Sequence, residues 1–146
     1  MTRRILHPTD FSRASSAAFT RALADARASR SELVLVHVLA PVIPVAGEGY
    51  VSPSVYEQMT ESARGWARKQ MDRLLAKAKA GRVRARGLVL EGVAHEQIVR
   101  AARQQRAAII IIGTHGRTGV ARFFLGSVAA RVAATAPCPV LTVRGR

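Results

Sequence analysis

The sequence Ile112-Gly-Thr-His-Gly-Arg-Thr-Gly-Val-Ala-Arg-Phe-Phe-Leu-Gly-Ser-Val128 joins a buried apolar strand to a helix through a loop rich in glycine. Gly113 ends the strand, Gly116 and Gly119 follow at steps of three, and Gly126-Ser127 opens the helix. Glycines let backbone amides approach a ligand, and a helix start presents unpaired N–H groups and about half a positive charge. The stretch therefore predicts a phosphate-binding loop. The alternative is a flexible loop that ends in an ordinary helix cap.

The position of this loop in the chain predicts the order of the strands. It is not a Walker A loop, because no Gly-Lys-Ser/Thr follows, and it is not GxGxxG, whose glycines belong in the first strand-to-helix turn. That turn here is His7-Pro-Thr-Asp-Phe-Ser12 and contains no glycine. Ligands of open parallel sheets lie where the strand order reverses. Since the glycine loop follows the fourth strand, we favour the order 3-2-1-4-5, which places it beside the loop after strand one, over 2-1-3-4-5.

Short β-branched runs alternate with longer helical stretches along the whole chain, which is typical of βα units around a parallel sheet. The predicted strands are Arg3–Pro8, Leu33–Leu39, Val83–Leu90, Ala107–Ile112 and Val140–Val143. The predicted helices are Ser12–Ser29 with Ser12 as N-cap, Val55–Ala80, His95–Gln105 and Ser127–Ala136. In the second helix, Met59, Trp66 and Met71 belong to an apolar stripe that we expect to pack in the core. We expect one α/β domain over residues 1–146, an open five-stranded parallel sheet with helices on both faces.

Three further segments carry predictions about the edges of the sheet and its surroundings. Arg82, Arg84 and Arg86 alternate with apolar residues, which suits an edge strand that is exposed to water. The apolar strand Val140–Val143 is an unprotected edge, and we expect a two-fold homodimer through residues 139–143. The stretch Ala40–Ser54 has no regular period, and it is either a lid over a site or a surface excursion.

Several residues lie where they can line the predicted ligand crevice between the loops after the first and fourth strands. The Asp10 carboxylate can accept hydrogen bonds from an adenine amine or a ribose hydroxyl, or it can cap the first helix. Val38 can cover a base. His115 can polarise a phosphate, and Arg117 and Arg122 can pair with phosphates. The alternative for each of these loop side chains is that it points into solvent, which is the more common position of a loop histidine. The sequence shows no Ser-His-Asp or paired-carboxylate spacing that would indicate catalysis.

The charge of the chain is strongly positive. It has 23 Lys and Arg against 9 Asp and Glu, a formal net charge of +14, and all the cations except Lys69, Lys77 and Lys79 are arginine. Such a charge raises the local concentration of polyanions such as nucleic acid. The arginines are nevertheless dispersed from Arg3 to Arg146, which favours a solvated surface. Aromatic residues make up only 5% of the chain, so few platforms are available for stacking on single strands.

The numbers and positions of cysteine and histidine limit which disulfides and metal sites the chain can form and indicate its cellular compartment. The single Cys138 cannot form an internal disulfide, and His7, His37, His95 and His115 have no paired metal-ligand spacing. The N-terminal sequence reaches Pro8 after two apolar residues, which is too short for a signal-peptide core or a membrane span. We therefore expect a cytoplasmic protein without a membrane segment.

At these residues the chain resembles the universal stress protein family, and in particular its ATP-binding branch. The nucleotide motif of that branch is Gly, two residues, Gly, nine residues, Gly, then Ser or Thr, and Gly113, Gly116, Gly126 and Ser127 fit it without a gap. The opening Ile-Leu-His-Pro-Thr-Asp-Phe-Ser, the Leu-Val-His-Val that ends the second strand, and the closing Ala-Pro-Cys-Pro-Val-Leu-Thr-Val-Arg are also similar to the family. The resemblance covers the whole chain.

The resemblance implies a stress-response regulator that binds an adenine nucleotide and forms a homodimer. Asp10 and Val38 would hold the adenine; Pro8, Thr9 and Gly113 would line the ribose; Gly116, Gly126, Ser127 and Val128 would take the phosphates. With neighbouring residues, the candidate nucleotide-binding set is Pro8, Thr9, Asp10, Val38, Ile112, Gly113, Thr114, His115, Gly116, Arg117, Gly126, Ser127 and Val128. We expect ATP, or AMP or cyclic AMP, with accompanying Mg²⁺ held mostly by phosphate oxygens and water. We expect no catalysis, and the alternatives are a slow ATPase or a basic nucleic-acid-binding protein.

Overall fold

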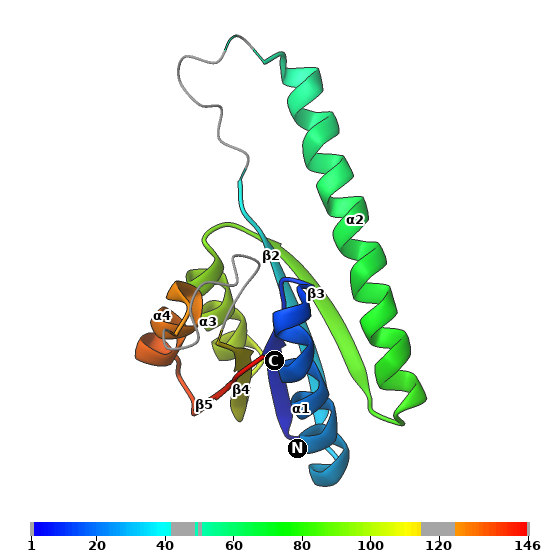
Figure 1. The fold of residues 1–146 in the computed structure, drawn as a ribbon, viewed down its shortest axis with the longest axis vertical. Coiled ribbons are helices and arrows are strands. Elements are labelled where there is room, and N and C mark those ends of the chain that lie inside the picture. The colour runs from blue at the N-terminus through cyan, green and yellow to red at the C-terminus, as the bar shows by residue number, and fades with distance from the viewer. Residues whose placement is uncertain (1, 42–48, 50, 115–124, 146) are drawn as a thin grey trace.

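The sheet has the strand order that the glycine loop predicted. The computed structural model describes residues 2–41, 49, 51–114 and 125–145. Its five strands are all parallel and lie in the order β3-β2-β1-β4-β5 (Figure 1). Along the chain the elements are β1 (Arg4–Pro8), α1 (Arg13–Ser29), β2 (Glu32–Leu39), α2 (Pro53–Ala80), β3 (Ala85–Glu91), α3 (Ala94–Gln104), β4 (Ile109–Gly113), α4 (Ser127–Thr135) and β5 (Val140–Val143). The predicted fold class and order are confirmed.

Helices cover both faces of the sheet and form two apolar clusters. Successive side chains of a strand point to opposite faces, so Leu33 and Leu35 of β2 pack against α1 and α2, whereas Val34 and Val36 pack against α3 and α4. The side chain of Ser12 accepts a hydrogen bond from Ser15 N–H, which confirms Ser12 as the N-cap of α1.

Two details of the prediction were wrong at the α2–β3 connection. The strand begins at Ala85 rather than Val83, so that Arg82 and Arg84 precede it and only Arg86 lies in β3. The chain must reverse after α2, and it does so through Arg82 at φ 59° and a hydrogen bond from Val83 N–H to the Ala78 carbonyl. The position of β3 at an edge of the sheet is confirmed.

The apolar stripe of α2 is only half buried. Met71 lies in the core as expected, but Met59 is 50% exposed and Trp66 is 41% exposed. The reason is that the amino-terminal half of this long helix extends past the sheet, as Figure 1 shows. The predicted segment Ala40–Ser54 falls mostly on residues 42–48 and 50, which lie outside the described residues. Among the described residues, no helix is long and apolar enough to cross a membrane.

His7 is a fully buried histidine of β1. Its Nδ1 lies 2.8 Å from the Ile111 carbonyl oxygen, which makes Nδ1–H the donor, and its Nε2 has no hydrogen-bond partner among the described residues. Burial lowers the pKa of His7 from 6.5 to about 4, although the bond to Ile111 opposes the shift. The imidazole is therefore neutral in the folded protein at pH 7.

This shift predicts a loss of stability in acid. The pKa of His7 is about 4 in the folded protein and 6.5 in the unfolded chain, so only the unfolded chain takes up the proton as pH falls from 6.5 towards 4. Lowering the pH from 7.5 to 5 should reduce the free energy of unfolding by about 2 kcal/mol through His7 alone. Urea unfolding of the wild type and of His7→Leu at both pH values measures this, and the variant should lose less on acidification. If the wild type and His7→Leu lost the same free energy of unfolding on acidification, the lowered pKa of His7 would be contradicted.

Candidate functional site

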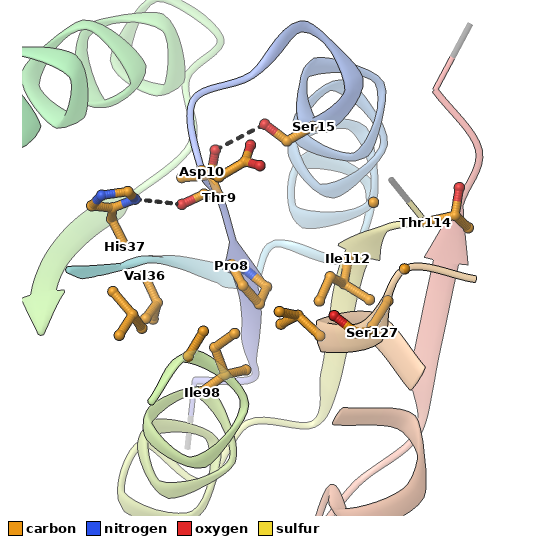
Figure 2. A pocket seen from close by; sticks show the side chains of 16 residues that line it. Pro8, Thr9, Asp10, Ser15, Val36, His37, Ile98, Ile112, Thr114 and Ser127 are labelled. Atoms are coloured by element: carbon orange, nitrogen blue, oxygen red, sulfur yellow. Dashed lines mark hydrogen bonds between the residues drawn. The ribbon is translucent and has the colours of Figure 1, made fainter. Parts of the chain in front are cut away.

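A pocket of about 330 Å³ opens at the carboxyl ends of β1 and β4, where the strand order reverses (Figure 2). Every candidate nucleotide-binding residue in the described part of the chain lines it: Pro8, Thr9, Asp10, Val38, Ile112, Gly113, Thr114, Gly126, Ser127 and Val128. The candidates His115, Gly116 and Arg117, together with Arg122, lie outside the described residues. The tertiary structure thus brings the loop after β1 and the ends of the glycine loop into one site.

Six further residues line the pocket that sequence reasoning missed: Ser15, Val36, His37, Ala94, Ile98 and Ala129. Val36 and Ile98 are core residues by pattern, and nothing in their local sequence distinguishes them from other buried aliphatic residues. His37 did carry a signal, because it is a polar residue within the otherwise apolar run of β2. The floor of the pocket, drawn in Figure 2, therefore comes from α3 and β2 as well as from the two loops.

The loop after β1 is held by a chain of side-chain hydrogen bonds. Thr9 Oγ1 accepts from Phe11 N–H at 3.0 Å and lies 3.1 Å from Ser15 Oγ. Ser15 Oγ donates to the Ser12 carbonyl at 3.0 Å, so the Thr9 hydroxyl is the donor to Ser15. These bonds fix Phe11 in the left-handed region at φ 62°, a conformation that costs an L-residue with a bulky side chain free energy. They also bond Thr9 to the start of α1.

Asp10 sits on this loop at the rim of the pocket. Its Oδ1 accepts from the Ser12 N–H at 2.9 Å. Through this contact the carboxylate holds Ser12, whose side chain is the N-cap of α1. The carboxylate thereby stabilises the turn and lies between the pocket and the start of the helix (Figure 2).

His37 ties the same loop to β2. Its Nδ1 lies 2.7 Å from the Thr9 carbonyl oxygen, so Nδ1–H donates, and Thr9 N–H donates to the Val36 carbonyl at 2.8 Å. The imidazole packs against Phe11 at a centroid distance of 4.5 Å and against Trp66 at 6.3 Å. The ring of Trp66 in α2 thus packs against the loop after β1, which we call the pocket loop, and the Trp66 side chain remains partly exposed.

The start of α4 forms the opposite wall. Gly126 N–H donates to the Thr114 carbonyl at 2.6 Å, and Thr114 N–H donates to the Val143 carbonyl at 2.9 Å, so both ends of the glycine loop are fixed beside β5. Among the side chains of residues 2–41, 49, 51–114 and 125–145, none caps α4. The first amides of a helix have no intrahelical acceptor and carry partial positive charge. The pocket therefore combines an apolar floor with a donor-rich end, and no group of acids, histidines or cysteines among the described residues is arranged to hold a metal ion.

Comparison with known proteins shows the family of the chain. A profile of the universal stress protein family matches residues 1–144. The chain belongs to the universal stress protein family. It is 35% identical over 144 residues to the "universal stress protein in QAH/OAS sulfhydrylase 3'region" of Thermus aquaticus, covering 99% of this chain and 100% of the relative.

Solved structures of the family share the fold. The structure of the hypothetical protein MJ0577 matches with a TM-score of 0.85 at 27% identity, over 100% of this chain and 98% of that one; MJ0577 is a universal stress protein of Methanocaldococcus jannaschii. A universal stress protein in complex with cAMP matches with a TM-score of 0.72 at 23% identity, over 99% and 98%. As a universal stress protein, the chain thus shares its fold with these structures over nearly its whole length.

Removal of the Thr9 hydroxyl should destabilise the pocket loop. Thr9→Val keeps the shape of the side chain but leaves Phe11 N–H without this acceptor, so the free energy of unfolding should fall by about 1–3 kcal/mol. Thr9→Ser keeps the hydroxyl and serves as the control in the same urea unfolding measurement. A loss in Thr9→Ser as large as that in Thr9→Val would show that the hydroxyl network does not hold the loop.

Proposed function

We propose that this universal stress protein binds an adenine nucleotide, with ATP as the expected ligand, in the pocket between the loops after β1 and β4. The observation that carries the proposal is that one pocket joins an apolar slot to the start of α4, which no described side chain caps. An adenine ring needs apolar surfaces with a few polar groups at its edge, and a phosphate chain needs converging donors. The lining of the pocket offers apolar side chains from β2 and α3 and the first amides of α4.

The apolar part of the pocket suits the base. Val36 and Val38 come from β2 and Ile98 comes from α3, and their side chains face the same cavity. Asp10 at the rim offers a carboxylate to the exocyclic amine of adenine or to a ribose hydroxyl. The universal stress protein that was solved with cAMP supports this choice, because cAMP contains the same base and sugar.

The phosphates would lie against the start of α4. Ser127 and Val128 are exposed and supply the first helical amides, and Ser127 adds a hydroxyl. Mg²⁺ would accompany the phosphates and take most of its ligands from phosphate oxygens and water. Asp10, the carboxylate of the described pocket lining, already engages Ser12 N–H, and hydrolysis needs a group that positions water. We therefore propose a regulatory binding protein in the stress response with slow or no turnover.

We also propose that the protein forms a homodimer through β5. This strand lies at an edge of the sheet and consists of Val140-Leu-Thr-Val143. Its outer backbone groups can pair with a second copy about a two-fold axis, which removes the exposed edge.

The charge of Asp10 should contribute to nucleotide affinity. Asp10→Asn keeps an oxygen that can accept from Ser12 N–H, so the loop is preserved, but the amide is a weaker acceptor for the nucleotide. We expect calorimetry to show about tenfold weaker ATP binding, since a hydrogen bond to a charged group contributes about 1.5–3 kcal/mol. Asp25→Asn is the matched control, because Asp25 pairs with the exposed Arg21 on α1 and does not line the pocket. Unchanged affinity in Asp10→Asn would remove Asp10 from the site.

A proline at the start of α4 tests the phosphate end. Ser127→Pro removes one amide donor, and proline is tolerated at the first helical position. Gly126 already has φ −56° and ψ 150°, the conformation that a residue before proline adopts. We expect ATP affinity to fall about tenfold or more while adenosine affinity changes little, with Ser127→Ala reporting the hydroxyl alone. Equal losses for ATP and adenosine would place the phosphates elsewhere.

A further inference from the structure

The arginines that are scattered in the sequence gather at the amino edge of the sheet. In a parallel sheet with right-handed crossovers, the helices end where the strands begin. Exposed cations gather at these junctions, and we refer to six arginines among them as the basic edge: Arg3, Arg30, Arg82, Arg84, Arg103 and Arg106. Figure 1 shows the ends of α1 and α2 and the start of β3 at the same end of the molecule.

Hydrogen bonds place the segments that carry these residues side by side, as a row along the edge. Leu33 N–H donates to the Arg84 carbonyl, Glu32 N–H donates to the Arg3 carbonyl, and Arg106 N–H donates to the Arg103 carbonyl. The side chain of Arg4 reaches across to the Gln105 carbonyl at 2.8 Å, which joins the end of α3 to the start of β1. The row therefore runs from β3 through β2 and β1 to the end of α3.

Acidic groups do not neutralise this row. Glu32 pairs with Arg4 and Arg86, at 3.0 Å and 3.2 Å, and so is already shared between two further cations. Within the described residues, none of the six cations of the basic edge forms an ion pair with an acid. The basic edge therefore keeps a concentrated positive charge that faces solvent.

The backbone conformation at three of these arginines gives a second, independent observation. Arg30, Arg82 and Arg106 have φ values of 53°, 59° and 51°, and they follow the ends of α1, α2 and α3. Glycine or asparagine is the usual choice at such left-handed positions, because other residues pay a steric cost. Cations at a helix end also stabilise the helix dipole, and Arg27, Lys77, Lys79 and Arg103 already lie in the last turns. Arg3 and Arg84 precede strands and serve no helix in this way. Fold stability alone does not account for the whole row.

We propose that the basic edge binds the sugar–phosphate backbone of a nucleic-acid duplex. Arginine presents a planar fork of donors that matches phosphate oxygens. Three steps between neighbouring strands, from β3 to β4, span about 14 Å, and a duplex carries one phosphate charge per about 1.7 Å of its axis. About four phosphates on the facing side can therefore lie along the row. The contact reads no bases and is independent of sequence.

Other polyanions fit this surface less well. The exposed large apolar residues of the described chain are Val51, Val55, Met59, Trp66, Val93, Leu125 and Val128, and none lies at the basic edge. The surface thus lacks the apolar groups that insert into a lipid interface. The six residues include no aromatic ring on which the bases of a single strand can stack.

The nucleotide pocket lies at the opposite, carboxyl edge of the sheet. Because the two sites share no residue, duplex binding at the basic edge does not depend on the proposed ATP site. A variant of one site can therefore be tested while the other site serves as a control for folding.

Glycine substitutions test the basic edge without disturbing the fold. The triple variant Arg30→Gly/Arg82→Gly/Arg106→Gly removes three charges at positions where the backbone favours glycine, so its urea stability should not fall. Binding is measured by fluorescence anisotropy with a labelled 20-base-pair DNA duplex and with an RNA duplex of equal length. For the wild type, the logarithm of the association constant should fall with log[salt] at a slope of about −4. In the triple variant we expect the affinity at about 0.1 M salt to fall tenfold or more and the slope to become shallower by about 2 to 3.

The matched control is Arg13→Gln/Lys69→Gln/Arg131→Gln, which removes three exposed cations of α1, α2 and α4 that lie outside the basic edge. This variant should keep most of the duplex affinity, and both triple variants should bind ATP equally well. The proposal is overturned if neither duplex binds at 50 mM salt (about 14 Å screening length), or if both variants lose the same affinity. Binding to phosphatidylserine vesicles without binding to either duplex would also overturn it.

Discussion

Strand β1 pairs with β2 on one side and with β4 on the other, and this pairing creates the pocket. Strand β1 is five residues long, and it is buried from Ile5 to Pro8. Its two neighbours follow in opposite directions along the sheet, so the connections leave on opposite faces and open a space at their carboxyl ends. Without this reversal, the loops that contain Asp10 and Gly113 would not share a pocket.

Because all strands of the sheet run in the same direction, the amino and carboxyl ends of the strands carry different chemical groups. Helix starts, with their unpaired amides, face the carboxyl edge, and helix ends face the amino edge. The start of α4 thus lies at the pocket, and the arginines that follow α1, α2 and α3 lie at the basic edge. A nucleotide and a duplex both carry phosphate, but the first would be met by backbone amides in a narrow pocket and the second by long side chains on an open surface.

The shape of the pocket depends on contacts between side chains of the protein that support the loop after β1. His37 joins the loop after β1 to β2, and Phe11 and Trp66 pack on its ring. These contacts also explain why α2 keeps Trp66 partly exposed, since the ring reaches the edge of the loop where the sheet ends. The position of α2 and the shape of the pocket loop are therefore linked through one cluster of rings.

The fold class, the strand order and the loops that flank the pocket could be predicted from the amino-acid sequence. These features are predictable because the alternation of apolar runs, the N-cap Ser12 and the spacing of the glycines are local patterns that can be read within short segments of the chain. The sequence did not determine the start of β3 or the exposure of Met59, because these depend on where α2 runs relative to the sheet. Only the tertiary structure added Ser15, His37 and Ile98 to the pocket, and only it gathered dispersed arginines into the basic edge. Contacts between residues far apart in the chain are set by the register and direction of the strands, and no single segment encodes them.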